Sequence, residues 1–446
     1  MLPPANITAA AAALRQRKYS VRDLTEHFLQ TIERLESQIR AWVIVDRQAA
    51  LRQADSLDQE AAADRWRGPL HGIPLGVKDI IDVRGYPTKA GSALRNGAAA
   101  ALQDAPAVAC LRENGAVILG KTVTTEFACF DPPPTVNPLN VERTPGGSSS
   151  GSAAAVAAKM CMAALGSQTG GSITRPASYC GIAGFKGEIG ATCRAGEQDV
   201  DMREGVVPVS LHLDHVGPLA GDVQGLAWMW KGMQGRFPEG EYAALPEIDA
   251  PRLGWIETYF WEQADDPMRR VCDRALETLR QAGAELQRIE PPKSFAQVHA
   301  MHRRLMVADA FAYHRDDWLN RPEMFAPGVA SLLAEGSEVA VEDYRRAMEH
   351  QQVFSAEMKA VVRGFDAVLT PAAMTAAPGR ETTGDPRLNA PWSYCGIPTA
   401  TSPGGVAEEG MPCGLQWAGV DSQGLLAAAR WCEKALEPEL QRLRFL

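Results

Sequence analysis

Residues 152–164 of this chain are almost all small or apolar, and they follow directly on a glycine- and serine-rich run at 146–152. A helix built from this apolar segment would have no polar face, so it is expected to be buried on all sides. The sequence therefore predicts a helix over 152–164 inside a layered fold, with the glycine-serine run at its N-terminus. A flexible linker is the alternative for 146–152, but it would leave the apolar helix exposed.

Strand-like and helix-like patterns alternate around this segment. Apolar runs at 75–78, 116–120 and 366–371 predict strands, and a helix that opens at 104–106 leads into the second of them. Such strand–helix–strand patterns are typical of a parallel sheet with crossover helices. We therefore expect an α/β fold.

Helices are also expected elsewhere along the chain, at the N-terminus and in the C-terminal half. Ser20 resembles the N-cap of a capping box, and Asp46 is expected to cap a second N-terminal helix. Charged helices are predicted at about 267–282 and 340–362, and a closing helix near 421–436.

Composition excludes several classes of protein. The 446 residues are 46% hydrophobic and 22% charged, which is ordinary for a soluble globular protein. A net charge of −9 without a lysine- or arginine-rich block argues against nucleic-acid binding, and no apolar run reaches the ~20 residues of a membrane span. Nine cysteines without a C-x-x-C pair, and no secretory signal, predict reduced thiols in a cytoplasmic protein. The eight histidines form no metal-ligand pattern, so we expect no metal and no other cofactor.

Two serines and one lysine indicate acyl-transfer chemistry. Ser148 and Ser172 each follow a Gly-Gly pair, and Lys78 ends a predicted strand. A serine needs a base to become a nucleophile, and a lysine can serve only when it is neutral. Burial lowers the lysine pKa from ~10.4, and a second serine could carry the proton between lysine and nucleophile. A phosphate-binding loop is disfavoured because its Gly-Lys-Ser/Thr ending is absent.

The segment Thr169-Gly170-Gly171-Ser172 is a candidate oxyanion hole. Glycine permits unusual backbone angles, so consecutive N–H groups could turn toward one point.

With these motifs in this order, the chain resembles the amidase signature family. The resemblance is dense over about 68–222 and thin over 224–365. The matching segments are 72–79 (Gly-Ile-Pro-Leu-Gly-Val-Lys-Asp), 145–157, 164–178, 180–186 and 214–219, with weaker matches at 398–403 and 414–416. The resemblance implies an α/β/α sandwich around one large mixed, mostly parallel sheet. It also implies a single amidase domain over 1–446, with 68–222 as its core and about 224–365 as a variable region that shapes the substrate pocket.

The resemblance also implies roles for the candidate residues. Ser172 would be the nucleophile, Ser148 the bridging serine after a cis Gly147–Ser148 peptide bond, and Lys78 the base. The backbone of 169–172 would hold the oxyanion.

Three further residues are candidates for substrate binding: Gly147, Gln168 and Arg175. Arg175 could bind a substrate carboxylate, but we favour a structural role, and Gln168 is expected to support the site by hydrogen bonding. The polar segment 191–204 is expected to be a loop that edges the pocket. Several apolar residues could line an acyl pocket, although most are expected in the core: Trp228, Trp230, Met233, Met301, Met306, Trp392 and Trp417.

The expected function is hydrolysis of carboxamide C–N bonds, with carbamates or esters as alternative substrates. Its partners would be a small-molecule substrate and water, and the resemblance suggests a homodimer. A glutaminase subunit of an amidotransferase and a non-catalytic binding protein are ranked below.

Overall fold

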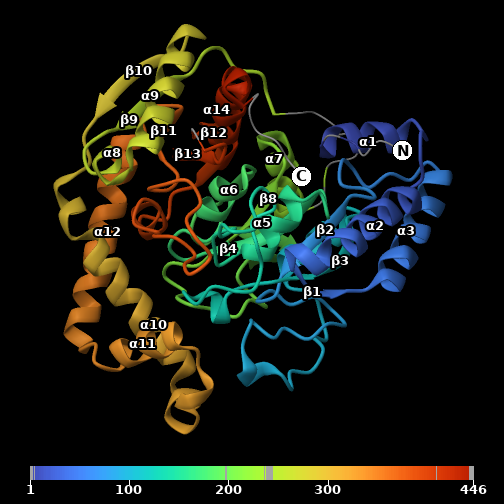
Figure 1. Ribbon diagram of the computed structural model, residues 1–446, viewed down its shortest axis with the longest axis horizontal. Helices are drawn as coiled ribbons and strands as arrows, with labels where there is room; N and C mark the ends of the chain where they lie inside the picture. The colour runs from blue at the N-terminus through green and yellow to red at the C-terminus, as the bar shows by residue number, and fades with distance from the viewer. Residues whose placement is uncertain are drawn as a thin grey trace.

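The computed structural model (Figure 1) describes residues 4, 6–195, 198–235, 237, 245–407 and 409–440. Within these residues the strands are β1 (Trp42–Val45), β2 (Pro74–Lys78), β3 (Val117–Thr122), β4 (Ala163–Gln168), β5 (Ala183–Lys186), β6 (Thr192–Ala195), β7 (Gln198–Asp201), β8 (His215–Ala220), β9 (Arg252–Ile256), β10 (Glu285–Ile289), β11 (Ala367–Pro371), β12 (Thr399–Val406) and β13 (Pro412–Ala418).

The same residues form fourteen α-helices. They are α1 (Ile7–Arg15), α2 (Val21–Ile39), α3 (Arg47–Ala62), α4 (Pro106–Glu113), α5 (Ser150–Ala157), α6 (Thr174–Cys180), α7 (Val223–Gln234), α8 (Phe260–Gln263), α9 (Asp266–Gln281), α10 (Val298–Asn320), α11 (Pro327–Ser337), α12 (Val341–Val362), α13 (Ala390–Tyr394) and α14 (Ser422–Ala435). In Figure 1, α1–α3 and the long helices α10–α12 lie at opposite sides of the view.

Eleven of the described strands form one mixed sheet in the order β1-β3-β2-β4-β8-β5-β12-β13-β11-β9-β10. Parallel pairing occurs in two blocks, β3-β2-β4 and β11-β9-β10. Antiparallel pairs through β8, β5, β12 and β13 join the blocks, and β1 adds an antiparallel edge. The predicted α/β fold around a large mixed sheet is thus confirmed.

Helices cover both faces of this sheet. A Cβ on Gly166 of β4 would lie 2.8 Å from both Leu219 of β8 and Ser149, the residue that precedes α5. The next residue of β8, Ala220, lies 3.0 Å from the corresponding position on Gly225 of α7. Successive strand residues point to opposite faces, so α5 and α7 lie on opposite sides. The expected three-layer sandwich is therefore confirmed.

Several predicted helix boundaries are also confirmed. Ser20 and Asp23 form a reciprocal capping box at the start of α2, and the Asp46 side chain accepts a hydrogen bond from the Ala49 N–H at the start of α3. The helices expected at 267–282, 340–362 and 421–436 are α9, α12 and α14.

The prediction of one helix over 152–164 is wrong at its C-terminal end. Helix α5 is fully buried as expected, but it ends at Ala157, and Lys159 adopts a left-handed conformation with φ of 54°. Ala163 and Ala164 then pair with β2 and β8 as the first residues of β4. Alanine suits a helix by itself, so here the pairing with neighbouring strands overrides its local preference.

The expectation for 191–204 is also wrong. Its described residues include the antiparallel pair β6–β7, which forms a small separate sheet that packs on α4 and α7. None of these residues lines the cavity at Ser172 described below.

All nine cysteines are buried and none is in a disulfide. None of the helices in the described ranges combines the length and the apolar character that crossing a membrane requires. The sequence also favours a connector over 235–251, and part of that segment lies outside the described residues.

Candidate active site

The sheet brings the candidate residues to one edge. Strands β2 and β4 are parallel neighbours, with Val77 opposite Leu165, so their carboxyl ends lie side by side. Lys78 is the last residue of β2, and the segment 169–172 follows β4 directly. Ligands of open α/β sheets commonly bind outside such carboxyl ends.

Lys78 is held between two serine hydroxyls. Its Nζ donates hydrogen bonds to Ser148 Oγ at 2.7 Å and to Ser167 Oγ at 2.8 Å, and its side chain is completely buried. Burial disfavours the ammonium form and lowers the pKa of Lys78 to about 7, although the negative charge of Asp214 acts in the opposite direction. A substantial neutral fraction is therefore present near neutral pH.

A second buried lysine shows that burial alone does not identify the base. Burial also lowers the pKa of Lys186 to about 7, but among the described residues its Nζ donates only to the carbonyl oxygens of Ile397 and Gly187, at 2.6 and 3.2 Å. Lys78 differs because its partners are hydroxyl groups, which can exchange protons with it.

Side-chain hydrogen bonds hold the backbone of the loop that carries Ser148. The Gly147–Ser148 peptide bond is cis, as the family resemblance implied. Arg175 Nη2 donates to the carbonyl of Gly147 at 2.8 Å, and Ser150 Oγ donates to the carbonyl of Gly146 at 2.7 Å. These bonds hold the carbonyl group of the cis peptide unit itself and that of the unit before it.

The backbone after β4 presents free donors. Gln168 Oε1 accepts the N–H groups of Ile173 and Thr174, both at 2.9 Å, at the start of α6. Within the part of the chain that the structure describes, the N–H groups of Gly170, Gly171 and Ser172 have no hydrogen-bond partner. Three consecutive unpaired N–H groups beside a serine can stabilise an oxyanion.

Asp214 supports the same segment. Its Oδ1 accepts a hydrogen bond from Thr169 Oγ1 at 2.5 Å, and its Oδ2 accepts the N–H groups of Val209 and Ser210 at 2.8 and 2.9 Å. Burial raises the pKa of Asp214 to about 6, against the effect of these hydrogen bonds.

Ser148 and the segment 169–172 face a cavity of about 670 Å³, a size typical of small-molecule sites. It is lined by Thr125, Ala128, Cys129, Phe130, Ser148, Thr169, Gly170, Gly171, Ser172, Arg175, Val209, Tyr259, His299, His302, Arg303, Met306, Thr382, Thr383, Gly384, Asp385, Pro386, Arg387 and Ala390. Both candidate serines and the whole of 169–172 are in this lining. Lys78 is not, because it lies behind Ser148.

Of the three tentative substrate-binding residues, only Arg175 reaches the cavity. Gly147 is covered by Thr383, whose Cγ2 lies 2.8 Å from the position of a Cβ on the glycine. Gln168 is completely buried and supports α6, as the expected hydrogen-bonding role requires. Arg175 Nε donates to the carbonyl of Thr383 at 2.6 Å, and its buried Nη1 has no partner among the described residues.

The tryptophan and methionine candidates belong mainly to the core, as expected. Of that set, only Met306 lines the cavity. Trp392 and Trp417 are completely buried.

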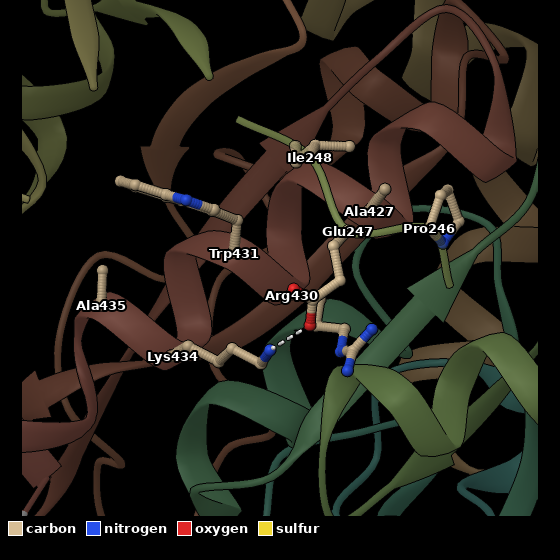
Figure 2. Close-up of a pocket in the computed structure, with 8 residues that line it drawn as sticks. All are labelled: Pro246, Glu247, Ile248, Ala427, Arg430, Trp431, Lys434 and Ala435. Carbon is tan, nitrogen blue, oxygen red and sulfur yellow. Dashed lines mark hydrogen bonds and ion pairs between the residues drawn. The ribbon is translucent and has the colours of Figure 1, made fainter. Parts of the chain in front are cut away.

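A second hollow, of about 410 Å³, lies between residues 246–248 and α14 (Figure 2). Figure 2 shows Lys434 extending toward Glu247, and their Nζ and Oε1 atoms form an ion pair at 3.4 Å. The eight lining residues, drawn in Figure 2, include no serine, cysteine or threonine that could act as a nucleophile. The cavity at Ser172 is therefore the better candidate for an active site.

The family of the chain follows from its match to a family model. The amidase family model matches residues 23–423, which is nearly the whole chain. The chain belongs to the amidase signature family. The resemblance seen in its motifs is thereby confirmed.

The curated relatives of this amidase have several names. The chain is 32% identical to a putative amidase, AmiD, of Mycobacterium tuberculosis, over 93% of this chain and 90% of that protein. It is 31% identical to an amidase of Pseudomonas putida, over 96% and 95%. It is also 32% identical to one chain of the glutamyl-tRNA(Gln) amidotransferase of Geobacter metallireducens, over 95% of both chains.

Solved structures share the fold. The peptide amidase of Stenotrophomonas maltophilia superposes with a TM-score of 0.80 at 26% identity, over 97% of this chain and 96% of that chain. A structure described as a vestigial protein complex that reveals the origins of an s-triazine catabolic enzyme gives 0.87 at 29% identity, over 96% and 98%.

Sequence reasoning missed three residues of the site in this amidase. Ser167 and Asp214 lie inside the matched motifs but are not among the residues for which the resemblance implied a role. His302 comes from α10, where the sequence matched nothing specific, and its Nε2 lies 3.0 Å from the carbonyl oxygen of Thr169. The register of the sheet could have revealed Ser167. Strands β2 and β4 are parallel neighbours, and Lys78 and Ser167 lie near their carboxyl ends, so the two side chains come close together.

Proposed function

We propose that this enzyme cleaves carboxamide C–N bonds through an acyl-enzyme on Ser172, with Ser148 as the bridging serine and Lys78 as the base. One observation carries the proposal: Lys78 Nζ lies 2.7 Å from Ser148 Oγ, behind a cavity that Ser148 shares with Ser172. The N–H groups of Gly170, Gly171 and Ser172, which have no partner among the described residues, belong to the same lining. Membership of the amidase signature family supports the same chemistry.

The first half of the reaction forms the acyl-enzyme. Ser172 Oγ attacks the substrate carbonyl while its proton passes to Ser148, whose own proton passes to neutral Lys78. The carbonyl oxygen becomes an oxyanion that accepts hydrogen bonds from the N–H groups of Gly170, Gly171 and Ser172. When the C–N bond breaks, the leaving amine takes up the proton that Lys78 had accepted.

The second half restores the enzyme. Water attacks the ester on Ser172 and gives a proton through Ser148 to Lys78. The second tetrahedral intermediate then collapses to the carboxylic acid, and Ser172 recovers its proton. The same steps would apply to carbamates and esters, which differ in the group that leaves.

The cavity walls favour an uncharged substrate with an apolar portion. Of the three arginines in the lining, Arg387 is paired with Asp385 at 2.7 Å and Arg303 with Glu335 at 2.6 Å. The third, Arg175, donates to the carbonyl oxygens of Gly147 and Thr383, and its Nη1 has no partner among the described residues. Tyr259 and His299 form an aromatic wall, with ring centroids 5.2 Å apart. We therefore propose small neutral carboxamides as the preferred substrates.

The variable region contributes directly to this cavity. Tyr259, His299, His302, Arg303 and Met306 all come from 224–365 and line it. This supports our proposal that 1–446 acts as one amidase domain whose variable region shapes the pocket.

A substrate panel tests the proposal. Purified protein is assayed with 4-nitroanilides, 4-nitrophenyl esters, 4-nitrophenyl carbamates and simple aliphatic and aromatic carboxamides, the last by release of ammonia. We expect turnover of amides that is abolished in Ser172→Ala, and labelling of Ser172 by a fluorophosphonate. Labelling of another serine, with Ser172 unmodified, would contradict the assignment. A component of an amidotransferase would instead hydrolyse glutamine only when partner chains are added.

A further inference from the structure

An oxyanion hole built on glycines needs an external anchor. Glycine has no Cβ, so the peptide units on either side of Gly170 and Gly171 can rotate with little steric cost. The N–H groups of these residues are useful in catalysis only when they already point at the developing charge. The contacts that fix the peptide units therefore decide how well the hole works.

The peptide unit between Thr169 and Gly170 is fixed by a histidine. His302 Nε2 lies 3.0 Å from the carbonyl oxygen of Thr169, and the His302 side chain is buried. A carbonyl oxygen can only accept a hydrogen bond, so Nε2 must carry the proton and donate it. Burial lowers the pKa of His302 to about 4, so the ring stays neutral at neutral pH.

Peptide planarity transmits this contact to the hole. In a trans peptide the C=O of one residue and the N–H of the next point in opposite directions. With the carbonyl of Thr169 held toward His302, the N–H of Gly170 is held away from it. Ser393 acts in the same way on the following unit, because its Oγ donates to the carbonyl of Gly170 at 2.9 Å and so orients the N–H of Gly171.

His302 belongs to the helix that forms one wall of the cavity. His299, Arg303 and Met306 also lie on α10 and line the cavity; His299 and Met306 are three and four residues from His302, and Arg303 is its neighbour. Residues three or four apart share one face of a helix. The same face therefore meets the substrate and holds the peptide unit beside the nucleophile.

We propose that His302 is a positioning residue for the proposed hydrolysis, which orients the Gly170 N–H of the oxyanion hole by donating a hydrogen bond to the carbonyl of Thr169. Through it the variable helix α10 takes part in stabilising the transition state as well as in binding substrate. The inference rests on the proposed function of Ser172.

Two substitutions of His302 separate positioning from packing. His302→Leu removes the donor, whereas the amide nitrogen of His302→Gln can take the place of Nε2. His314→Leu is the matched control, because His314 is a second buried histidine on α10, with a pKa also lowered to about 4, and it packs against Phe127 and Phe325 away from the cavity lining.

The expected result is a loss in kcat with little change in KM. Removal of a whole oxyanion-hole donor typically costs about 10²–10³-fold in kcat, so misplacing one should cost His302→Leu about 10–10²-fold. His302→Gln should recover most of this loss, and His314→Leu should keep wild-type kcat. Inhibition by butylboronic acid, whose serine adduct places an oxygen in the hole, should weaken by the same factor as kcat.

Other outcomes overturn the inference. The inference fails if His302→Leu keeps wild-type kcat, or if it changes KM alone. It also fails if His314→Leu loses as much kcat as His302→Leu, or if butylboronic acid inhibits His302→Leu as strongly as the wild-type enzyme. If His302→Leu does not fold, His302→Asn serves instead, since its shorter side chain remains polar but cannot reach the carbonyl. Failure of the proposed function is recognised separately, because Ser172→Ala would then retain turnover.

Discussion

The hydroxyl of Ser167 accepts a hydrogen bond from Lys78 Nζ at 2.8 Å, so the proposed base has a second fixed partner besides Ser148. A neutral amine has two N–H groups and one lone pair. If one N–H donates to Ser167, the lone pair can accept the proton of Ser148. Ser167 thus holds Lys78 in the orientation that proton transfer needs, without itself touching the substrate.

Ser167→Ala should therefore lower kcat, by about tenfold, because a hydrogen bond to a group that becomes charged typically contributes about 1.5–3 kcal/mol and part of it is retained by rearrangement. KM should change little, since Ser167 is absent from the lining of the cavity. Steady-state kinetics measure both values. Ser167→Thr keeps the hydroxyl and is the control; equal losses in the two variants would show that packing, not the hydrogen bond, is responsible.

Ser148→Ala removes the proposed proton bridge. Loss of one general acid–base contribution typically lowers the rate about 10²–10⁴-fold, so activity should fall by that amount but not vanish. Single-turnover kinetics on a 4-nitrophenyl ester would measure the acylation step directly. A Ser148→Ala enzyme with wild-type acylation would show that no proton passes through this serine.

The sequence was sufficient for the layered fold and for the grouping of the three proposed catalytic residues. A buried apolar helix, a strand that ends at Lys78 and two Gly-Gly-Ser sequences are local signals. The structure places Lys78 beside Ser148 and both serines in the lining of one cavity. The sequence could not predict the end of α5 at Ala157. That boundary depends on which neighbouring strands pair with Ala163, and local propensity carries no such information.

The supporting residues were harder to predict for the same reason. His302 is 133 positions from Thr169, and its role depends on how α10 packs against the sheet. Gln168 and Gly147 adjoin proposed catalytic positions in sequence, yet neither lines the cavity. Gln168 ends β4, where successive residues point to opposite faces, and Gly147 is covered by Thr383, so adjacency in sequence does not imply a shared cavity.

Arg175 offers a test of its structural role. Two of its nitrogens donate to the carbonyl oxygens of Gly147 and Thr383, at 2.8 and 2.6 Å, in a buried site. Lysine cannot reproduce this forked pattern, so Arg175→Lys should leave a buried carbonyl unpaired and lower the free energy of unfolding by about 1–3 kcal/mol. Urea denaturation measures this. Unchanged stability, together with a KM increase only for amides that carry a carboxylate, would favour the substrate-binding role.

Asp214→Asn should move the pH dependence of activity toward acid. The negative charge of Asp214 raises the pKa of Lys78, so its removal should lower that pKa further. Lys78 is active when neutral, and a lower pKa keeps it neutral to lower pH. The midpoint of the rise in kcat/KM should therefore shift to a lower pH, and an alkaline shift would contradict the electrostatic argument.

The pH profile of the wild-type enzyme tests Lys78 itself. Its pKa of about 7 means that it is protonated and inactive well below pH 7 and neutral well above it. The value of kcat/KM should accordingly rise with pH through a midpoint near 7 and then level off. Lys78→Arg should be inactive across the whole range, because a guanidinium remains protonated. Lys186→Met removes the other buried lysine with a pKa of about 7 and should leave the midpoint in place. A flat profile with chemistry shown to be rate-limiting, or a midpoint that disappears in Lys186→Met, would exclude Lys78 as the group that titrates.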